Sequence, residues 1–497
     1  MKTLYDYMNI LNWDPPTWAK NVNMPKKPFP HQLDDLKFFN KFTRFGLLSE
    51  PGTGKTRPIQ AQGACLAACK NKVVYIMPPI LLNQFYGSFR DNYQGIEEYL
   101  TIEILRGTPK QRDKLTGSWD SSTYPDILLM SFSMFTIYHE ILKAVGYAML
   151  FIDEATAVKN TSSKIHKAVH NFVNAGNGLA LVTGTPIETN VEDCYGLIRL
   201  LTPTAYSSKA NFEFVHVVKE FAPPHMAHMA KTLGYKNVDL LNYNLYAQSR
   251  RVRKKDVSDL PPRLITEYLV DLTPAHKSLY REIIEERLVE VGDELLDMTT
   301  SQALYQATQQ VLLNPEKFGK VIKDNALFEM LDSVVQILDS RKIIVYAWYN
   351  DSVDTICNRY KHLNPAKING TVTGVRREAE KQKFIHDNTC KMVVSNPKSG
   401  GVGIDGFQDI CSHVIYAEVC AQVGTFYQSI DRVHRRGQKA TTVNIYLLVA
   451  KDTVAVKLRN NLVKKDEWNE SVTRDKRTVL AELMGSDGIS GSFDLGD

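Results

Sequence analysis

Short apolar runs alternate with helix-compatible stretches in two separate parts of the chain, and no other feature of the sequence limits the possible folds as strongly. A strand followed by a helix and then another strand builds a parallel sheet, because the helix carries the chain back to where the next strand begins. In the first part, from about residue 28 to 206, the apolar runs are VVYIM (73–77), DILLMS (126–131), AMLFID (148–153) and LALVTG (179–184). We therefore expect a parallel sheet with functional loops at the strand ends.

The same pattern returns from about residue 324 to 465. Its apolar runs are KIIVYAW (342–348), KMVVS (391–395), HVIYAE (413–418) and VNIYLLV (443–449). A chain of 497 residues is too long for one ordinary domain. The sequence therefore predicts an α/β protein of two lobes, each a parallel sheet flanked by helices.

The middle of the chain has a different pattern. Residues 275–298 place apolar side chains at helical spacing, which predicts one long helix. The apolar positions are Leu279, Ile283, Leu288, Val291 and Leu295. We expect a mostly helical insertion and linker at residues 207–323, between a first lobe at 29–206 and a second lobe at 324–470. An N-terminal extension (1–28) precedes them, and a Gly- and Ser-rich tail (471–497), expected to be partly disordered, follows.

Composition narrows the classes of function without choosing one. The formal net charge of +5 permits a nucleic-acid partner but does not require one. Two basic runs, RRVRKK (250–255) and RVHRRGQK (432–439), are either binding surfaces or solvated faces. The seven cysteines form no C-x-x-C pair, and their odd number argues against a disulfide framework. The pairs His166/His170 and His225/His228 have ligand-like spacing, but no Cys partner accompanies them, which argues against a structural zinc. No apolar run reaches the roughly 18 residues that span a bilayer, so we expect a soluble protein from a reducing compartment, without a membrane partner.

The stretch LLSEPGTGKT (47–56) runs from an apolar strand end through a Gly-rich turn into a helix-compatible run. Glycines let backbone N–H groups surround phosphates, Lys55 would neutralise the β and γ phosphates, and Thr56 would hold Mg²⁺. The nucleotide-binding candidates are Pro51, Gly52, Thr53, Gly54, Lys55 and Thr56. Ser49 departs from the general pattern, which has Gly there. The alternative is a Gly-rich turn that binds no phosphate.

Two adjacent carboxylates, Asp153 and Glu154, follow the third apolar run. A motor ATPase needs one carboxylate on Mg²⁺ and another that positions or activates the attacking water. Alone, the pair would more often be a chance strand ending. With Lys55 upstream in the same chain, the order suits a RecA-like lobe. We predict that Asp153 joins Thr56 at the metal and that Glu154 serves the water.

The stretch LVTGTPIETN (181–190) places Thr183, Gly184 and Thr185 at a strand end. Such a turn can bond to the acidic pair and relay the nucleotide state, and we predict this coupling role. The alternative is a plain strand-ending turn.

In the second lobe, YQSIDRVHRRGQ (427–438) places Gln428, Arg432 and Arg435 at i, i+4 and i+7, one face of a helix. Arginine gives planar, bidentate contact with phosphate, so Arg432 and Arg435 are candidate arginine fingers and Gln428 a coupling residue. The alternative is a solvated basic helix.

Taken together, these motifs resemble those of the SWI/SNF-type DNA translocases of helicase superfamily two. The resemblance is collinear from about residue 29 to 453 and includes PFPHQ (28–32), FIDEATAVKN (151–160), the Leu-Pro-Pro segment after RRVRKK, VVSNPKSGGVGID (393–405) and QSIDRVHRRGQ (428–438). It implies two RecA-like lobes with ATP and Mg²⁺ as cofactors. It also implies that Gln32 reads adenine and that Gly403 and Asp405 contact the nucleotide.

The resemblance further implies ATP-driven movement on double-stranded DNA that remodels protein–DNA complexes or branched DNA without processive strand separation. Ser131, Tyr349 and Lys398 are candidate DNA contacts, with packing or loop solvation as the alternative for each. A strand-separating helicase and a non-catalytic DNA-binding scaffold remain alternative functions. We expect a monomer, with a protein partner for targeting as an option, in the cytoplasm of a prokaryote or phage-infected host, or in the nucleus of a eukaryote.

Three departures from the family pattern concern coupling rather than ATP binding. Thr156 stands where many relatives carry His, and the NPKSGG stretch at 396–401 is one residue longer than usual. The sequence QQVLLNPE (309–316) replaces the usual Cys-Asn-His-Pro ending.

Overall fold

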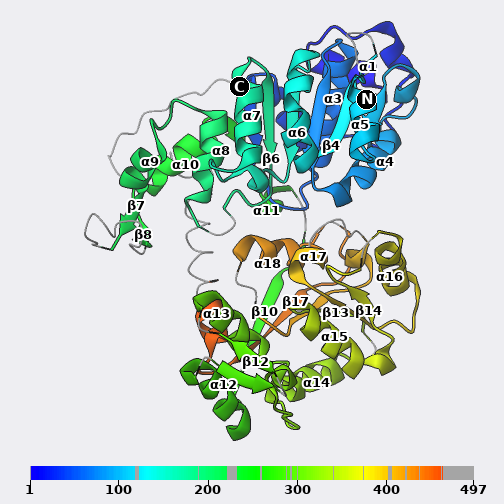
Figure 1. Ribbon diagram of the computed structural model, residues 1–497. Helices are drawn as coiled ribbons and strands as arrows, with labels where there is room; N and C mark the ends of the chain where they lie inside the picture. The colour runs from blue at the N-terminus through cyan, green and yellow to red at the C-terminus, as the bar shows by residue number, and fades with distance from the viewer. Residues whose placement is uncertain are drawn as a thin grey trace, which may run out of the picture. The chain divides into compact units, whose positions relative to one another are not determined.

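The computed structural model describes residues 2–117, 123–187, 190–220, 232–257, 260–286, 288–291, 294–298, 300–339, 341–372, 374–400, 406–419, 422–435, 437–460 and 462. The described residues form two compact units (Figure 1). Unit 1 extends to Val257, and unit 2 contains the described residues from Leu260 to Leu462.

Unit 1 is built on a seven-stranded sheet whose described strand pairs are all parallel. The strand order is β3-β4-β2-β5-β6-β1-β9. The strands are β1 (Arg44–Leu47), β2 (Val73–Met77), β3 (Ile102–Ile104), β4 (Ile127–Ser131), β5 (Met149–Asp153), β6 (Gly178–Val182) and β9 (Ser249–Arg250). The four apolar runs of the first part of the chain are β2, β4, β5 and β6, which confirms the predicted parallel sheet.

Neighbouring residues of a strand point to opposite sides of the sheet, and here both sides carry apolar residues. Helices therefore cover both faces of the sheet (Figure 1). Val73, Tyr75 and Met77 of β2 pack in a core with α1 to α4, whereas Val74 and Ile76 pack in another with α6 to α8. The helices are α1 (Leu4–Ile10), α2 (Pro30–Phe39), α3 (Thr56–Ala68), α4 (Leu82–Asn92), α5 (Pro109–Gly117), α6 (Phe132–Ala144), α7 (Lys164–Asn174) and α8 (Asp193–Leu201).

The chain after α8 adds a smaller subdomain to unit 1. Its apolar cluster joins Tyr195 of α8 to Phe212 and Leu241. Its elements are α9 (Lys209–His216), the antiparallel pair β7 (Val217–Lys219) and β8 (Thr232–Tyr235), α10 (Val238–Tyr246) and α11 (Lys254–Val257). Between α10 and α11 the chain returns to the main sheet as β9, at its edge beside β1.

Unit 2 is built on a six-stranded sheet in the order β10-β17-β16-β13-β15-β14, again with parallel pairs throughout its described part. The strands are β10 (Arg263–Val270), β13 (Ile343–Tyr346), β14 (Ala366–Ile368), β15 (Met392–Ser395), β16 (His413–Tyr416) and β17 (Val443–Ala450). The helices are α12 (Pro274–Glu286), α13 (Ser301–Gln310), α14 (Ala326–Leu338), α15 (Asn350–Arg359), α16 (Gly374–His386), α17 (Pro397–Gly400) and α18 (Val423–Ile430). The four apolar runs of the second part are β13, β15, β16 and β17.

The middle of the chain differs from expectation in two ways. The prediction of one long helix at 275–298 is wrong. Helix α12 ends at Glu286, and two antiparallel strands follow it, β11 (Leu288–Val291) and β12 (Glu294–Asp297). A Gly-Asp sequence between two valine- and leucine-containing runs is a hairpin signal, and it outweighed the helical spacing. The expected insertion at 207–323 is also not one body, since its described residues up to Val257 belong to unit 1 and β10 pairs with β17 in unit 2.

Both units are thus α/β with a parallel sheet covered by helices, which confirms the predicted fold class. Across the described parts of the chain, no helix combines the length and the apolar character needed to cross a bilayer.

Candidate nucleotide site

The Gly-rich loop of unit 1 joins the end of β1 to the start of α3 at Thr56. Gly52 and Gly54 both have φ of 83°, a left-handed conformation that favours glycine. A Cβ atom at position 54 would also lie 2.7 Å from Nε2 of Gln32. Gly54 is therefore required both by its backbone conformation and by the close approach of Gln32.

Gln32 lies on α2, and its buried amide spans two backbone groups. Its Nε2 donates to the Gly54 carbonyl (2.9 Å), and its Oε1 accepts from Phe29 N (2.9 Å). The ring of neighbouring His31 bonds to the Thr53 carbonyl at 2.9 Å. The PFPHQ stretch therefore holds the Gly-rich loop directly, and the proposed contact of Gln32 with adenine stays a prediction.

Lys55 is anchored within the same loop. Its Nζ donates to the Glu50 carbonyl (3.2 Å), which also accepts from the Thr53 hydroxyl (2.7 Å). Thr56, the first residue of α3, is half-buried. The ammonium group of Lys55 thus bonds back to the loop itself, and a lysine at this position is typical of phosphate-binding turns.

The acidic pair lies at the same edge of the sheet as the loop. Val182 of β6 pairs with Leu47 of β1 on one side and with Asp153 of β5 on the other. Because parallel strands end at a common edge, Asp153 and the start of the loop are separated by a single strand. Burial raises the pKa of Asp153, neighbouring Glu154 raises it further, and Lys55 opposes both.

Glu154 has an unusual backbone conformation. Its φ of 60° and ψ of 60° place it in the left-handed region, which is uncommon for residues other than Gly, Asn and Asp. It precedes a short 3-10 helix, Ala155–Val158, and is half-buried. A strained backbone conformation costs free energy and persists only where the surrounding structure holds it in place. Such conformations are therefore concentrated at functional sites.

The predicted coupling turn lies between the other two elements. Thr183 is buried, its N–H donates to the Leu47 carbonyl (3.2 Å), and its hydroxyl accepts from Thr185 N (3.2 Å). A Cβ atom at Gly184 would lie 2.5 Å from Cγ of Pro51, so this turn touches the Gly-rich loop. The structure therefore brings Pro51, Lys55, Asp153 and the coupling turn together at one edge of unit 1.

The predicted helix face in unit 2 is wrong. Gln428 is on α18, but α18 ends at Ile430, and Arg432 and Arg435 lie in the turns that follow. The His434 ring bonds to the Pro261 carbonyl (2.8 Å), ahead of β10, and Gly437 has φ of 99°. In these turns Val433 N (3.0 Å) and His434 N (2.9 Å) both donate to the Ile430 carbonyl. Both arginines are half-buried.

The three candidate DNA contacts differ in exposure. Ser131 is buried, and its hydroxyl caps α6 by accepting from Met134 N (3.4 Å). This contact agrees with packing, the alternative to DNA contact that was considered for Ser131. Tyr349 is half-buried at the start of α15, and burial raises its pKa. Lys398 on α17 is exposed. Gly403 and Asp405 lie outside the described residues.

Sequence reasoning missed Ser49 and Glu50. The Ser49 hydroxyl accepts from Val252 N (3.0 Å), and the Glu50 carboxylate pairs with Arg251 (3.0 Å). The departure from Gly at position 49 therefore supplies an acceptor for the basic run 250–255, which is not simply a solvated face. The sequence did contain one signal for this contact. The Gly-rich loop carries an acidic residue, Glu50, and a basic run at 250–255 could pair with it.

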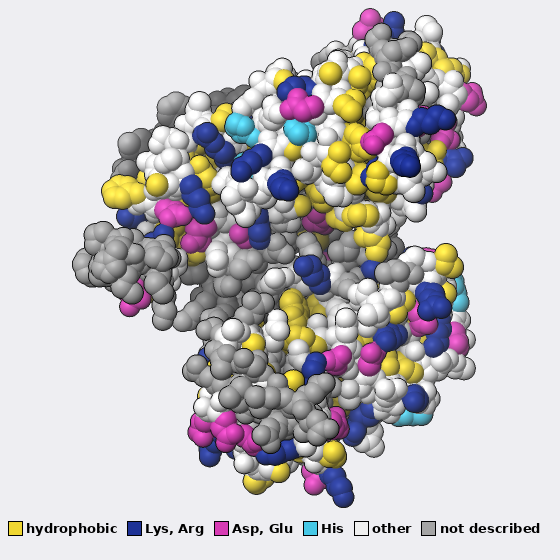
Figure 2. All heavy atoms as spheres, viewed as in Figure 1, with side chains coloured by type: hydrophobic (Ala, Val, Ile, Leu, Met, Phe, Trp, Pro, Cys, Tyr) yellow, Lys and Arg dark blue, Asp and Glu magenta, His cyan; other side chains and the backbone are white. Residues whose placement is uncertain are grey.

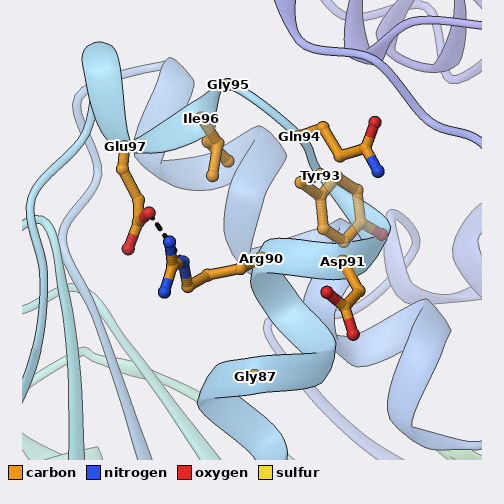
Figure 3. A pocket seen from close by; sticks show the side chains of 8 residues that line it. All are labelled: Gly87, Arg90, Asp91, Tyr93, Gln94, Gly95, Ile96 and Glu97. Atoms are coloured by element: carbon orange, nitrogen blue, oxygen red, sulfur yellow. Dashed lines mark ion pairs between the residues drawn. The ribbon is translucent and has the colours of Figure 1, made fainter.

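One hollow of the described structure lies apart from the predicted site residues. A hollow of about 390 Å³ at the end of α4 is lined by residues that include Arg90 and Glu97, which form an ion pair (2.8 Å), and by no predicted site residue (Figure 3). On the face drawn in Figure 2, Lys and Arg side chains are interspersed with Asp and Glu on both units. Among the described residues, no group of three or more His, Cys, Asp or Glu side chains could hold a metal. Thr56 and Asp153 would supply only two protein oxygens, which suits Mg²⁺ because Mg²⁺ keeps several waters and binds substrate phosphates.

Comparison with known families gives two matches, which overlap at residues 323–327. Residues 31–327 match the SNF2-related domain, and residues 323–437 match the helicase conserved C-terminal domain.

Among curated proteins, the chain is 25% identical to an uncharacterized ATP-dependent helicase of Mycoplasma pneumoniae, over 94% of this chain and 45% of that protein. It is 24% identical to the TATA-binding protein-associated factor MOT1 of Saccharomyces cerevisiae (90% and 27%) and 22% identical to the uncharacterized ATP-dependent helicase YqhH of Bacillus subtilis (92% and 81%). The chain thus spans less than half the length of the Mycoplasma and yeast relatives. The Sulfolobus solfataricus SWI2/SNF2 ATPase core, solved in complex with dsDNA, is 20% identical, with a TM-score of 0.40 over 94% of this chain and 98% of that one.

Proposed function

Because the chain belongs to the SNF2-related domain family, we propose that it is a DNA-dependent ATPase that moves along double-stranded DNA without processive strand separation. The observation that carries this proposal is the meeting of Lys55, Asp153 and Thr183 at one edge of the unit 1 sheet. A phosphate-binding lysine, an acidic pair and a hydroxyl-bearing turn are the parts that a nucleotide motor needs there.

The residues of this site take distinct roles in the proposal. Lys55 leaves the Glu50 carbonyl and neutralises the β and γ phosphates of ATP. Glu154 orients the attacking water and accepts its proton. A bound Mg²⁺ would neutralise phosphate charge, and Thr56 and Asp153 are the residues that would hold it. From unit 2, Arg432 and Arg435 would stabilise charge that develops on the γ-phosphate.

Movement along duplex DNA, rather than strand separation, is supported by the string DRVHRRGQ (431–438) and the Leu-Pro-Pro segment after RRVRKK, both typical of the SWI/SNF-type branch. We propose that the chain acts as a monomer. We also propose that it contacts the phosphate backbone of the DNA, so that binding does not depend on base sequence and weakens as the salt concentration rises. The action that follows from such movement is the displacement of proteins from DNA or the remodelling of branched DNA.

The test is ATP hydrolysis measured without DNA, with single-stranded DNA and with duplex DNA, beside triplex displacement and unwinding of a tailed duplex. We expect stimulation by duplex DNA and displacement of the third strand. Unwinding of the tailed duplex without triplex displacement would identify a strand-separating helicase. Absence of DNA stimulation, together with no effect of Glu154→Gln, would identify a non-catalytic DNA-binding scaffold.

A further inference from the structure

Residues 248–254 lie shortly before Val257, where the first part of unit 1 ends. They are bound along β1 and the start of the Gly-rich loop, and we call them the strap. The N–H groups that donate to it belong to β1 and to the start of the loop. The bonds are Gly46 N to Gln248 O (2.8 Å), Leu48 N to Arg250 O (2.9 Å) and Glu50 N to Val252 O (3.0 Å). Donors and acceptors both advance by two residues, as in a regular strand pair. The pairing of β1 with β9 therefore continues into the nucleotide-binding loop itself.

Side chains of the loop complete this attachment. The Glu50 carboxylate accepts from Arg251 Nη2 through Oε1 (3.0 Å) and from Lys254 N through Oε2 (3.0 Å). The hydroxyl of buried Ser49 accepts from the N–H of buried Val252. A charge-assisted contact in which the arginine is largely buried is less screened by solvent than a surface ion pair.

The strap is also attached to α2, the helix that carries Gln32. Arg250 Nε donates to Asp35 Oδ1 (2.7 Å), and Asp35 is buried. One short segment thus contacts both parts of the candidate nucleotide site, the Gly-rich loop through Arg251 and the Gln32 helix through Arg250. Beyond Val257 the chain passes into unit 2.

Glu50 links the strap to the phosphate-binding lysine. Its carboxylate binds the strap, while its carbonyl oxygen accepts from Lys55 Nζ (3.2 Å). When Lys55 turns to a nucleotide phosphate, this carbonyl loses its cationic donor. The Glu50 peptide then sits in a changed electrostatic environment, and its N–H is bonded to the strap.

We propose that Glu50 and Arg251 are positioning residues that couple nucleotide occupancy of the Gly-rich loop to the segment leading into unit 2. This proposal rests on the proposed ATPase function. Without the Glu50–Arg251 contact, ATP still binds, but a displacement of the Gly-rich loop is no longer transmitted to the strap. DNA therefore stimulates hydrolysis less.

The test compares Arg251→Gln and Glu50→Gln with the matched control Arg253→Gln. Arg253 lies on the same strap and forms an ion pair with Asp256 (2.8 Å). We expect Arg251→Gln to lower the stimulation of hydrolysis by duplex DNA about tenfold, while the KM for ATP without DNA changes by less than about threefold. The double variant should lose less stimulation than the sum of the two single losses, because both changes weaken the Glu50–Arg251 contact, while Glu50 also binds Lys254 N.

A second measurement follows the strap directly. Hydrogen exchange of residues 248–254 should differ between the nucleotide-free and ADP-bound protein, and Arg251→Gln should abolish that difference. A purely structural contact would instead lower the melting temperature and leave the stimulation ratio intact, which overturns the proposal. Unchanged stimulation in both single variants also overturns it. A wild-type protein that shows no DNA stimulation refutes the proposed function, a result distinct from either.

Discussion

Gly184 lies directly against Pro51, so the turn that follows β6 and the Gly-rich loop touch without an intervening side chain. A Cβ atom at position 184 would lie 2.5 Å from Pro51 Cγ and 3.1 Å from Pro51 N. The proline ring cannot rotate away, because it is fixed to its own backbone. A displacement of one loop must therefore move the other.

Gly184→Ala should displace the Gly-rich loop and weaken ATP binding. Misplacement of a binding group by a fraction of an ångström weakens its contacts with the ligand. We therefore expect the KM for ATP to rise at least about tenfold. Steady-state hydrolysis at varied ATP concentration measures this. The matched control is Gly87→Ala on α4, where an added Cβ meets no atom within 4 Å. Equal KM values for Gly184→Ala and wild type would contradict the proposed contact.

The sequence predicted best what depends on local pattern. Eight apolar runs became eight strands of two parallel sheets, since buried strands need continuous apolar residues whatever lies around them. The Gly-rich loop was predictable for a similar reason. Its glycines are required by backbone conformation at Gly52 and Gly54.

What the sequence could not give depends on contacts between distant segments. The turns after α18 are held by the bond from His434 to the Pro261 carbonyl, 173 residues away in sequence. The role of Ser49 depends on Val252 and cannot be inferred from the loop alone. Spacing within one helix or strand carries no information about such partners.

Glu154→Gln should abolish hydrolysis and preserve nucleotide binding. The amide keeps the shape of the side chain but cannot accept a proton from water, and we expect kcat to fall by about 10²- to 10⁴-fold. Single-turnover hydrolysis and binding of a fluorescent ATP analogue separate the two effects. Because Glu154 has φ of 60°, Glu154→Gly should lose hydrolysis as well, yet keep or raise the free energy of unfolding by up to about 1 kcal/mol. A strongly destabilised Glu154→Gly protein would show that the conformation is not strained.

Thr156→His should leave ATP binding intact. Thr156 lies in the short 3-10 helix after Glu154, two residues beyond the proposed water-binding carboxylate, and has no proposed part in holding the metal. We expect the KM for ATP without DNA to be unchanged and the DNA-stimulated rate to change by no more than about tenfold. Titration of ATP, with and without duplex DNA, tests both. Lost nucleotide binding would show that position 156 has been assigned the wrong role.

Glu418→Gln should change how stability depends on pH. Glu418 follows β16 in unit 2, and its buried carboxylate accepts from Trp348 N (2.5 Å), Tyr349 N (3.1 Å) and the Ser352 hydroxyl (2.6 Å). Burial raises its pKa from 4.5 to about 7, although these donors oppose the shift. Between these values the folded protein keeps a proton that the unfolded chain has released. The free energy of unfolding must therefore fall as pH rises from about 4.5 to 7, by on the order of 3 kcal/mol from this group.

Urea unfolding at pH 5, 6, 7 and 8 measures this slope. The slope should be smaller in Glu418→Gln, because the amide does not titrate and resembles the protonated acid. Asp354→Asn is the matched control, since it removes a half-exposed carboxylate of α15 that pairs with Lys367, and it should retain the wild-type slope. If Glu418→Gln and wild type show the same pH dependence, then Glu418 is ionised in the folded protein at pH 5, and the three donors outweigh its burial.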